Sequence, residues 1–443
     1  MERDGILCLL THEAGDFWSF PGHRHHGPGE ANSWIRERFG AEVSTMDVLR
    51  IPPESSAPPS YLFVHETHDA TEPPPPGTRW VPAAELDPHR APDGHHRLLA
   101  LWSAARHRRE GAEWLPWQRP GWFAMATAWA VGELRALGIE TVGPAEQDGF
   151  RAWSSQLRLP TTSGVIHLKA SPPPHGHEPA LTRLLAEWFP GAVPTVLAVD
   201  VPRRLMLTAD FGPVHRPEGA ARIVSHFERV AGQAALIQRE SAERAAEITA
   251  TGCPAHPLGR LPDLFDALIT QASDELTREE SAQLRRLVPG FARDCARLAL
   301  LGLPDTVVHH DLWRGNFRVD GDDVLLFDWA DSVLTHPFLQ LDILLRDLDD
   351  ALGSAEAHGQ VRDTYLAAWA GHRPPAELRE GLARAAAIAP VSRALLMRER
   401  LAGAPSHLRD RYRGAVTAPL RACLAPAGRA PDRTPEPATT RGN

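Results

Sequence analysis

The stretch Val307-Val308-His309-His310-Asp311-Leu312-Trp313-Arg314-Gly315-Asn316-Phe317, with Val324-Leu325-Leu326-Phe327-Asp328-Trp329 after it, decides the fold. The pattern predicts an apolar strand end, a polar loop, a short strand, a turn at Asp320-Gly321-Asp322 and a second apolar strand that ends at Asp328. Asp311, Asn316 and Asp328 then stand at loop and strand-end positions, where side chains can converge. A hairpin with a polar turn is the alternative, but the chain has only three asparagines, Asn32, Asn316 and Asn443.

The spacing of these residues is His-x-Asp-x-x-x-x-Asn with a second Asp one hairpin later, which is the catalytic-loop pattern of kinases. Phosphoryl transfer needs a carboxylate that orients and deprotonates an attacking hydroxyl, and Asp311 is the candidate. It also needs oxygen ligands that hold Mg²⁺ on the phosphates, and Asn316 and Asp328 are the candidates. The stretch therefore predicts a phosphotransferase site.

A single lysine supports this interpretation. Lys169 is the only lysine of the chain and lies near the end of the second strand of a predicted hairpin, after a turn at 161–164. A predicted helix follows, with Glu178 at its start and Pro179 at a tolerated first-turn position. A kinase strand lysine bridges nucleotide phosphates and a helix glutamate. A surface lysine near a helix-terminal glutamate is the alternative, but the order Lys, Glu, Asp, Asn, Asp favours the kinase interpretation.

Two further strands are predicted at 195–199 and 205–208, and Leu207, Thr208 and Ala209 lie where the chain leaves the second one. In a kinase this exit is the hinge, whose backbone groups pair with the edge of adenine. The Gly-rich pattern of protein kinases is missing between Trp153 and Gly164, so the contacts that cover the phosphates stay unassigned.

Residues 1–108 predict a separate small domain, with strands at 6–10 and 61–64 and a helix at 31–39 that ends at Gly40. Segments of this part resemble the Nudix fold: Trp18-Ser19-Phe20-Pro21-Gly22, Gly29-Glu30, Arg36-Glu37, Trp80-Val81-Pro82 and Glu85-Leu86. Where the Nudix box has glutamates, this chain has Pro28, Gly40 and Ala41. Because Glu30 and Glu37 alone are too few carboxylates for Mg²⁺ on a diphosphate, we expect a Nudix-like domain without hydrolase activity, dispensable for chemistry.

The composition limits the partners and the cellular compartment that we expect for this protein. The net charge of −9 argues against a nucleic-acid partner. No apolar run is long enough to span a bilayer and no signal peptide precedes the first strand, so a cytoplasmic protein without a membrane partner is expected. The four cysteines are far apart and form no metal-type pair, which fits a reduced compartment.

Residues 115–420 resemble the aminoglycoside phosphotransferase and choline kinase group of small-molecule kinases. The motifs at 309–316 and 326–331 carry the resemblance, supported by His167-Leu168-Lys169-Ala170, Glu178, Leu207-Thr208-Ala209-Asp210 and the 337–342 segment. The resemblance implies an α+β, bilobal protein-kinase-like fold, with a small antiparallel β-sheet N-lobe and a mostly helical C-lobe, preceded by the Nudix-like α/β domain. The implied ranges are 1–108 for that domain, 115–210 for the N-lobe, 211–423 for the C-lobe and 424–443 for a disordered tail.

The same resemblance implies ATP between the lobes and a role for each site residue. Asp311 is the catalytic base, Asn316 and Asp328 are Mg²⁺ ligands, and Lys169 with Glu178 orients the phosphates. His309 braces the loop, and Asp342 anchors it from the following helix. His310 stands where the family often has Gly, and Trp313 and Arg314 where it often has His or Asn and Pro.

Three functions follow as hypotheses: a Mg²⁺- and ATP-dependent kinase of a small-molecule hydroxyl, a nucleotide- or ligand-binding regulatory protein without turnover, and a Nudix-type hydrolase. The complete set of phosphoryl-transfer groups favours the first, and the missing carboxylates disfavour the third. Four acids, Asp342, Asp347, Asp349 and Asp350, lie on the helix after the site. They predict a cationic or polyhydroxylated acceptor, unless they only face solvent. The sequence does not distinguish aminoglycoside-like, amino-alcohol and sugar acceptors, or ATP from GTP.

Overall fold

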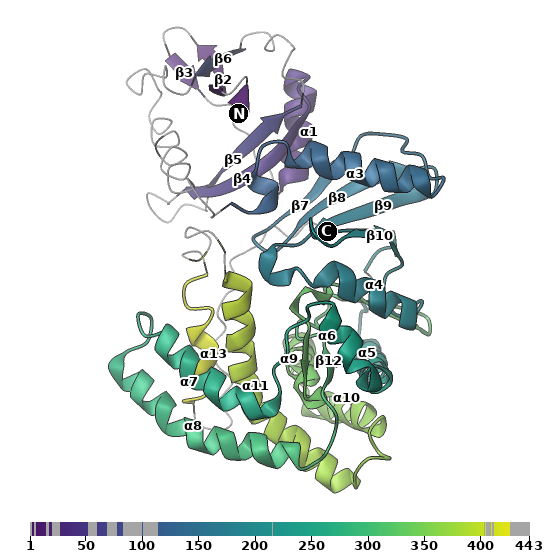
Figure 1. The fold of residues 1–443 in the computed structure, drawn as a ribbon, viewed down its shortest axis with the longest axis vertical. Helices are drawn as coiled ribbons and strands as arrows, with labels where there is room; N and C mark the ends of the chain where they lie inside the picture. The colour runs from purple at the N-terminus through teal and green to yellow at the C-terminus, as the bar shows by residue number, and fades with distance from the viewer. Residues whose placement is uncertain are drawn as a thin grey trace. The chain divides into compact units, whose positions relative to one another are not determined.

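A computed structural model describes residues 2–3, 6–14, 17–19, 27–51, 60–68, 78–82, 100, 114–214, 216–402, 404, 409 and 412–425. The chain divides into two compact units, one formed mainly by residues 1–172 and the other mainly by residues 173–402. Figure 1 shows the elements of both units. The predictions for Gly22, for Glu85-Leu86 and for nearly all of the 424–443 tail lie outside the described residues, and the domain boundaries stay predictions.

The first part of unit 1 contains a small antiparallel sheet, one helix and a hairpin. Strand β2 (Ile6–Ala14) pairs with β1 (Glu2–Arg3), β3 (Phe17–Ser19) and β6 (Thr78–Pro82). Strands β4 (Val43–Ile51) and β5 (Ser60–Thr67) pair with each other. Helix α1 (Pro28–Phe39) begins with a proline in its first turn and ends at Gly40, which has φ of 68°. Only glycine adopts this left-handed cap without cost, so the sequence signal placed the helix end correctly.

The second part of unit 1 adds 3₁₀ helix η3 (Pro116–Gln118), helix α3 (Trp122–Ala136) and strands β7 (Glu146–Phe150), β8 (Ser155–Thr161) and β9 (Gly164–Ala170). The three strands form an antiparallel ladder, with Leu157 opposite Leu168 and Leu159 opposite Ile166. These four apolar side chains are buried, because alternate residues of a strand face the same side. The hairpin therefore matches its prediction.

A buried polar network joins the two parts of unit 1. The Gln147 side chain of β7 accepts from the Thr45 backbone N–H at 2.7 Å and from Asn32 Nδ2 at 3.1 Å, and its Nε2 donates to the Thr45 carbonyl at 3.0 Å. The Gln118 amide likewise donates to Asp47 at 2.9 Å. A buried polar group without a partner costs about 1–3 kcal/mol. Removing the first hundred residues would therefore orphan Gln147 and Gln118, so the predicted dispensability of this part carries a structural cost.

Unit 2 begins with η4 (Pro173–His175), helix α4 (Glu178–Trp188) and the antiparallel pair β10 (Val196–Asp200) and β11 (Leu205–Ala209). Two other short ladders hold the catalytic stretch: β12 (Thr306–Val308) pairs with β15 (Val333–Thr335), and β13 (Phe317–Asp320) pairs with β14 (Asp323–Leu326). The predicted strand, loop and hairpin are therefore present.

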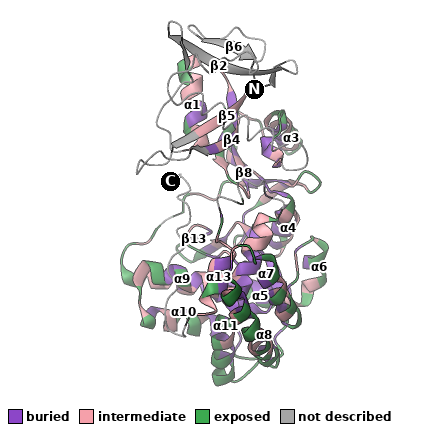
Figure 2. Ribbon diagram, turned by 90° about the vertical axis from the view of Figure 1, so that its left-hand side faces the viewer, coloured by how far each residue is buried: buried purple, intermediate pink, exposed green. Residues whose placement is uncertain are grey.

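Helices make up most of unit 2. They are α5 (Ala220–Ser241), α6 (Ala245–Ala250), α7 (Leu261–Gln271), α8 (Arg278–Ala299), α9 (Leu341–Leu352), α10 (Ala355–Ala367), α11 (Pro375–Leu401) and α13 (Thr417–Ala422). Helix α8 packs on α7 and α11, and α5 packs on α9 and α10 (Figure 1). Buried residues concentrate on α5 and α7, whose apolar faces form much of the core (Figure 2). The predicted α+β fold of sheet strands followed by a mainly helical part is confirmed. Within the described residues, no helix is both long and apolar enough to cross a membrane.

The contact between α1 and β7 gives a sharp test. A Cβ on Gly29 of α1 would lie 2.8 Å from the Gln147 carbonyl oxygen, whereas a Cβ on Gly132 of α3 meets nothing within 4 Å. We expect Gly29→Ala to destabilise unit 1 by about 1–3 kcal/mol through overpacking. Gly132→Ala should stabilise it by about 1 kcal/mol, because alanine is the better helix former. Urea unfolding measures both, and equal effects would contradict a tight α1–β7 contact.

Candidate active site

The predicted catalytic loop starts directly after β12, and its first residue is held from two sides. The His309 backbone N–H donates to Gln340 Oε1 at 2.8 Å, and His309 Nε2 donates to the Phe327 carbonyl at 2.9 Å. His309 is 1% exposed, and burial lowers the pKa of its imidazole, so the ring is neutral. His309 therefore lies where a loop-bracing residue is expected, between the loop and the end of the β13–β14 hairpin.

Two site residues have strained backbones. His310 has φ of 60° and Asp328 has φ of 67°, and Arg204 is the only other non-glycine residue with positive φ in the described part of the chain. Such conformations cost about 1–3 kcal/mol and persist only where surrounding contacts impose them. A left-handed backbone at His310 explains why glycine suits this position. His310 is nevertheless 6% exposed and lies within 3.4 Å of the Ser392 hydroxyl, so its ring fills space that glycine would leave empty.

Asp311 and Asn316 are bonded to each other. Asn316 Nδ2 donates to the Asp311 backbone carbonyl at 2.8 Å and to its Oδ2 at 3.2 Å. The Phe327 backbone N–H donates to the Asn316 carbonyl at 3.0 Å, which brings the adjacent Asp328 to the same loop. The structure thus brings together three of the predicted residues, Asp311, Asn316 and Asp328.

An arginine that the sequence did not indicate completes the site. Arg400 Nη2 of α11 lies 2.8 Å from Asp311 Oδ2, and the same guanidinium binds both oxygens of Asp331, with Nε donating to Oδ1 at 2.8 Å. His175 Nε2 lies 3.3 Å from Asp331 Oδ1. In sequence, Arg400 stands among basic residues in the last turn of a helix, where the helix dipole alone accounts for them. The usable signal was its seven-residue spacing from Arg393, which puts both on one face of α11.

Burial and the Arg400 charge have opposite effects on the pKa values of the carboxyl groups in this cluster. Burial raises the pKa of Asp311 to about 7, against the lowering effect of the Arg400 guanidinium. Although burial also acts on Asp331, Arg400 holds the pKa of that carboxyl well below its usual range. The side chains of Arg400 and Asp331 are 11% and 5% exposed. One guanidinium therefore compensates carboxylates that water reaches poorly.

The loop is anchored by residues on either side of the expected one. Asp342 was expected to anchor the loop, but its carboxylate pairs with Arg393 of α11. The anchor is Gln340, which accepts from His309, together with Asp347, which accepts from the Arg314 backbone N–H at 2.7 Å and its Nε at 2.9 Å. Gln340 and Asp347 are seven residues apart and face the loop together, whereas Asp342 is turned about 200° from Gln340 around the helix.

The predicted nucleotide-binding residues lie in both units. Lys169 is on β9 in unit 1, and Glu178 begins α4 in unit 2, where it is 1% exposed, so their pairing stays a prediction. Leu207, Thr208 and Ala209 form the end of β11. Leu207 and Thr208 are buried, and Ala209 lines a cavity of about 600 Å³ together with Phe211 and Arg318. Their hinge role also stays a prediction.

The donor chemistry of the site fits Mg²⁺. Asn316 uses its Nδ2 toward Asp311, which leaves Oδ1 as a possible metal ligand. Asp328 supplies a carboxylate beside it. Among the described residues, no group of three or more His, Cys, Asp or Glu could hold a metal ion. In nucleotide-dependent enzymes, Mg²⁺ is commonly held by one or two protein oxygens together with the phosphates of the substrate.

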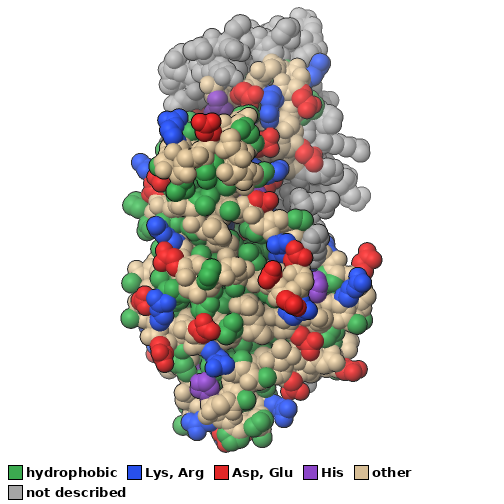
Figure 3. Space-filling model, turned by 90° about the vertical axis from the view of Figure 1, so that its right-hand side faces the viewer, with side chains coloured by type: hydrophobic (Ala, Val, Ile, Leu, Met, Phe, Trp, Pro, Cys, Tyr) green, Lys and Arg blue, Asp and Glu red, His purple; other side chains and the backbone are tan. Residues whose placement is uncertain are grey.

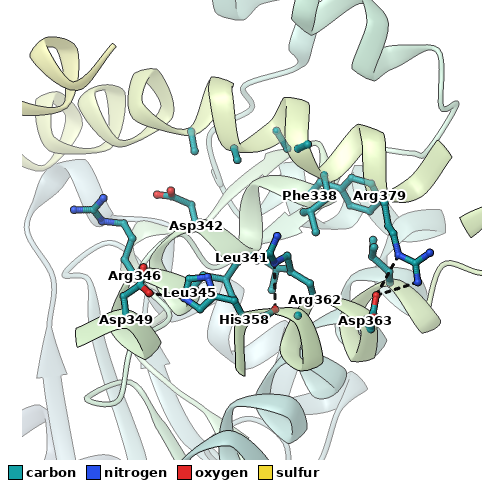
Figure 4. Close-up of a pocket in the computed structure, with 17 residues that line it drawn as sticks. Phe338, Leu341, Asp342, Leu345, Arg346, Asp349, His358, Arg362, Asp363 and Arg379 are labelled. Carbon is teal, nitrogen blue, oxygen red and sulfur yellow. Dashed lines mark hydrogen bonds and ion pairs between the residues drawn. The ribbon is translucent and has the colours of Figure 1, made fainter. Parts of the chain in front are cut away.

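A second cavity, of about 540 Å³, lies between α9, α10 and α11 (Figure 4). Its floor is apolar and includes Phe338 and Leu341, and charged side chains surround it. Figure 4 shows Asp349 against His358, at 2.9 Å, and Asp363 against Arg379, at 3.3 Å. The acids around this cavity are therefore largely engaged in ion pairs.

Three of the four acids of α9 are paired in this way. Asp342 binds Arg393, Asp347 binds Arg314 and Asp349 binds His358, while Asp350 also takes part in an interaction. On the face shown in Figure 3, acidic and basic side chains are interspersed over the described residues. The cationic character of the acceptor therefore stays a prediction.

Comparisons with known proteins agree with this site. Residues 175–380 match the model of the phosphotransferase enzyme family. No curated protein sequence matches the chain. Similar solved structures include macrolide 2'-phosphotransferase type I, with 16% identity and a TM-score of 0.45, covering 68% of this chain and 97% of that one. A choline/ethanolamine kinase family protein from Mesorhizobium loti has 19% identity and a TM-score of 0.47, covering 68% and 94%. Choline kinase from Cryptosporidium parvum Iowa II has 10% identity and a TM-score of 0.48, covering 67% and 94%.

The segment that matches the phosphotransferase family model, residues 175–380, contains the loop with Asp311 and Asn316 as well as Asp328. The prediction of a phosphotransferase-type enzyme is thereby confirmed. The Nudix-like character of the first hundred residues stays a prediction. Arg400 lies beyond the matched residues.

The anchoring contact can be tested at one amide. Gln340→Ala removes the acceptor of the buried His309 N–H, which should cost about 1–3 kcal/mol. We expect hydrogen exchange at the His309 amide to accelerate in this variant. Asp342→Asn, two residues away on the same segment, should leave that amide protected. Faster exchange in Asp342→Asn than in Gln340→Ala would restore Asp342 as the anchor.

Proposed function

We propose that the protein transfers the γ-phosphate of ATP to a hydroxyl group of a small molecule. The observation that carries the proposal is the bonded pair of Asp311 and Asn316 on a braced loop, with Asp328 beside it. A plain polar hairpin would not need a buried cation against its aspartate, nor two residues held in left-handed conformations. Both features cost stability, which suggests that they serve the site.

In the proposed reaction, Asp311 orients the acceptor hydroxyl and takes its proton while the oxygen attacks the γ-phosphorus. The bond between the γ-phosphorus and the oxygen that bridges it to the β-phosphate breaks, and ADP leaves. The proton then passes from Asp311 to solvent. Mg²⁺, when bound with the nucleotide, neutralises charge on the phosphates. Asn316 and Asp328 would hold the ion through oxygen atoms, and Lys169 with Glu178 would orient the phosphates.

The acceptor is proposed to be polyhydroxylated, such as a sugar or an aminoglycoside-like or amino-alcohol compound, with no requirement for a net positive charge. The support is the pairing of the α9 acids with Arg393, Arg314 and His358. A regulatory protein that binds nucleotide without turnover is the alternative. A panel of hydroxyl acceptors, each tested with ATP and GTP, separates the two by the release of ADP or GDP.

The first functional prediction concerns the base. Asp311→Asn keeps the size of the side chain and removes the proton acceptor. We expect the turnover number to fall by about 10²–10⁴-fold, the usual contribution of a general base. The control is Asp320→Asn, at the exposed turn of the hairpin that follows the loop, which should keep wild-type turnover. Unchanged acceptor-dependent ADP release in folded Asp311→Asn would remove the proposed mechanism.

The second functional prediction concerns the metal. Asn316→Ala and Asp328→Ala should each raise the Mg²⁺ concentration that gives half-maximal turnover. The effect of Asp328→Ala should be larger, because it removes a charge as well as a ligand. Turnover titrated against Mg²⁺ measures both effects. A metal dependence that neither substitution alters would show that these residues do not hold the ion.

A further inference from the structure

Arg400 contacts the proposed base in a selective way. In the described part of the chain, both side-chain contacts of Asp311 fall on the same oxygen: Arg400 Nη2 lies 2.8 Å from Oδ2, and Asn316 Nδ2 donates to Oδ2 at 3.2 Å. Oδ1 accepts no hydrogen bond from the residues that the structure describes. The carboxylate is thus fixed through one oxygen and presents the other.

Arg400 is itself held firmly enough to orient another group. Its guanidinium binds both oxygens of Asp331, and Asp331 is held in turn by His175 from η4. The planar fork of arginine suits such two-point binding, and the Arg400 side chain is only 11% exposed. Orientation through a flexible surface arginine would be weak, because solvent and rotamer freedom compete with the ion pair. Around Arg400, burial and the two-point contact with Asp331 reduce both solvent access and rotamer freedom.

We propose that Arg400 is a positioning residue for phosphoryl transfer: it clamps Oδ2 of Asp311 so that Oδ1 faces the acceptor hydroxyl. The inference rests on the proposed function. It extends that function to a residue on α11, twenty residues beyond the end of the family match at residue 380. Asp331 and His175 serve the same purpose indirectly, since they fix the guanidinium in place.

A purely structural ion pair is the competing explanation, and the chain offers a matched control for it. Arg393 lies seven residues before Arg400 on the same face of α11 and pairs with Asp342, which is outside the base contacts. Arg400→Ala would leave Asp331 buried without a cation and could unfold the unit, so it does not test positioning. Lysine at either position keeps the positive charge and loses the planar guanidinium. Comparing Arg400→Lys with Arg393→Lys therefore shows what the loss of guanidinium geometry does at each position, with the net charge unchanged.

The experiment uses the full chain and the acceptor that gives the highest ADP release in the panel. For Arg400→Lys, we expect the turnover number to fall about 10- to 100-fold, the usual cost of misplacing a reacting group by about an ångström. The KM for ATP and the KM for the acceptor should stay within about twofold of wild type. Arg393→Lys should keep wild-type turnover. Similar unfolding midpoints for the two variants confirm that both are folded.

Crystal structures of the wild type and Arg400→Lys provide a readout that does not need turnover. In the wild type, we expect one orientation of the Asp311 carboxylate, with Oδ2 on Arg400. In the variant, we expect the carboxylate to be rotated or to occupy two orientations. An unchanged orientation, an absent Arg400 contact in the wild type, or a turnover number that stays level or rises in Arg400→Lys would each overturn the inference. An inactive wild type with the expected orientations would instead refute the proposed function alone.

Discussion

The buried cation of Arg400 is the constraint on which the site depends. Arg400 contacts both Asp311 and Asp331, and the repulsion between these two carboxylates would drive them apart without its positive charge. Removing one partner of such a group costs about 3–5 kcal/mol, a large share of the stability of a domain. The ion cluster therefore fixes α11 against the catalytic loop and, through His175, against the segment before α4.

The sequence predicted the features that local signals encode. The hairpin with its turn at 161–164 was expected, and β8 and β9 form it. The loop spacing placed Asp311, Asn316 and Asp328 together, because a strand, a short loop and a hairpin leave the chain little freedom. Arg400 was missed because its partner Asp331 lies 69 residues away, and no periodicity reports such a pairing. Asp342 was named as an anchor because the family resemblance implied it, and the contact of Gln340 with His309 was not expected, because the turn of the helix decides which side chain faces the loop.

In the first hundred residues, too, the sequence predicted local features and missed contacts between distant residues. The end of α1 at Gly40 followed from glycine chemistry, and the strands followed from their apolar patterns. The attachment of this part to β7 did not follow, because Gln147 in a strand gives the pattern of a solvent-facing residue. In the structure it is 4% exposed and bonded to Asn32 and Thr45. Only the three-dimensional arrangement shows that this glutamine ties two stretches of sequence into one unit.

The place of Arg400 in the chain has a consequence for synthesis on the ribosome. A nascent chain meets the loop with Asp311 first, then Asp331, and only 69 residues after Asp331 the arginine that neutralises both. Until α11 emerges, the carboxylates repel each other and water competes for the loop, so the catalytic geometry cannot form while earlier helices fold. Assembly of the ion cluster is thereby tied to the late stage of translation, when α11 also adds its buried residues to the core.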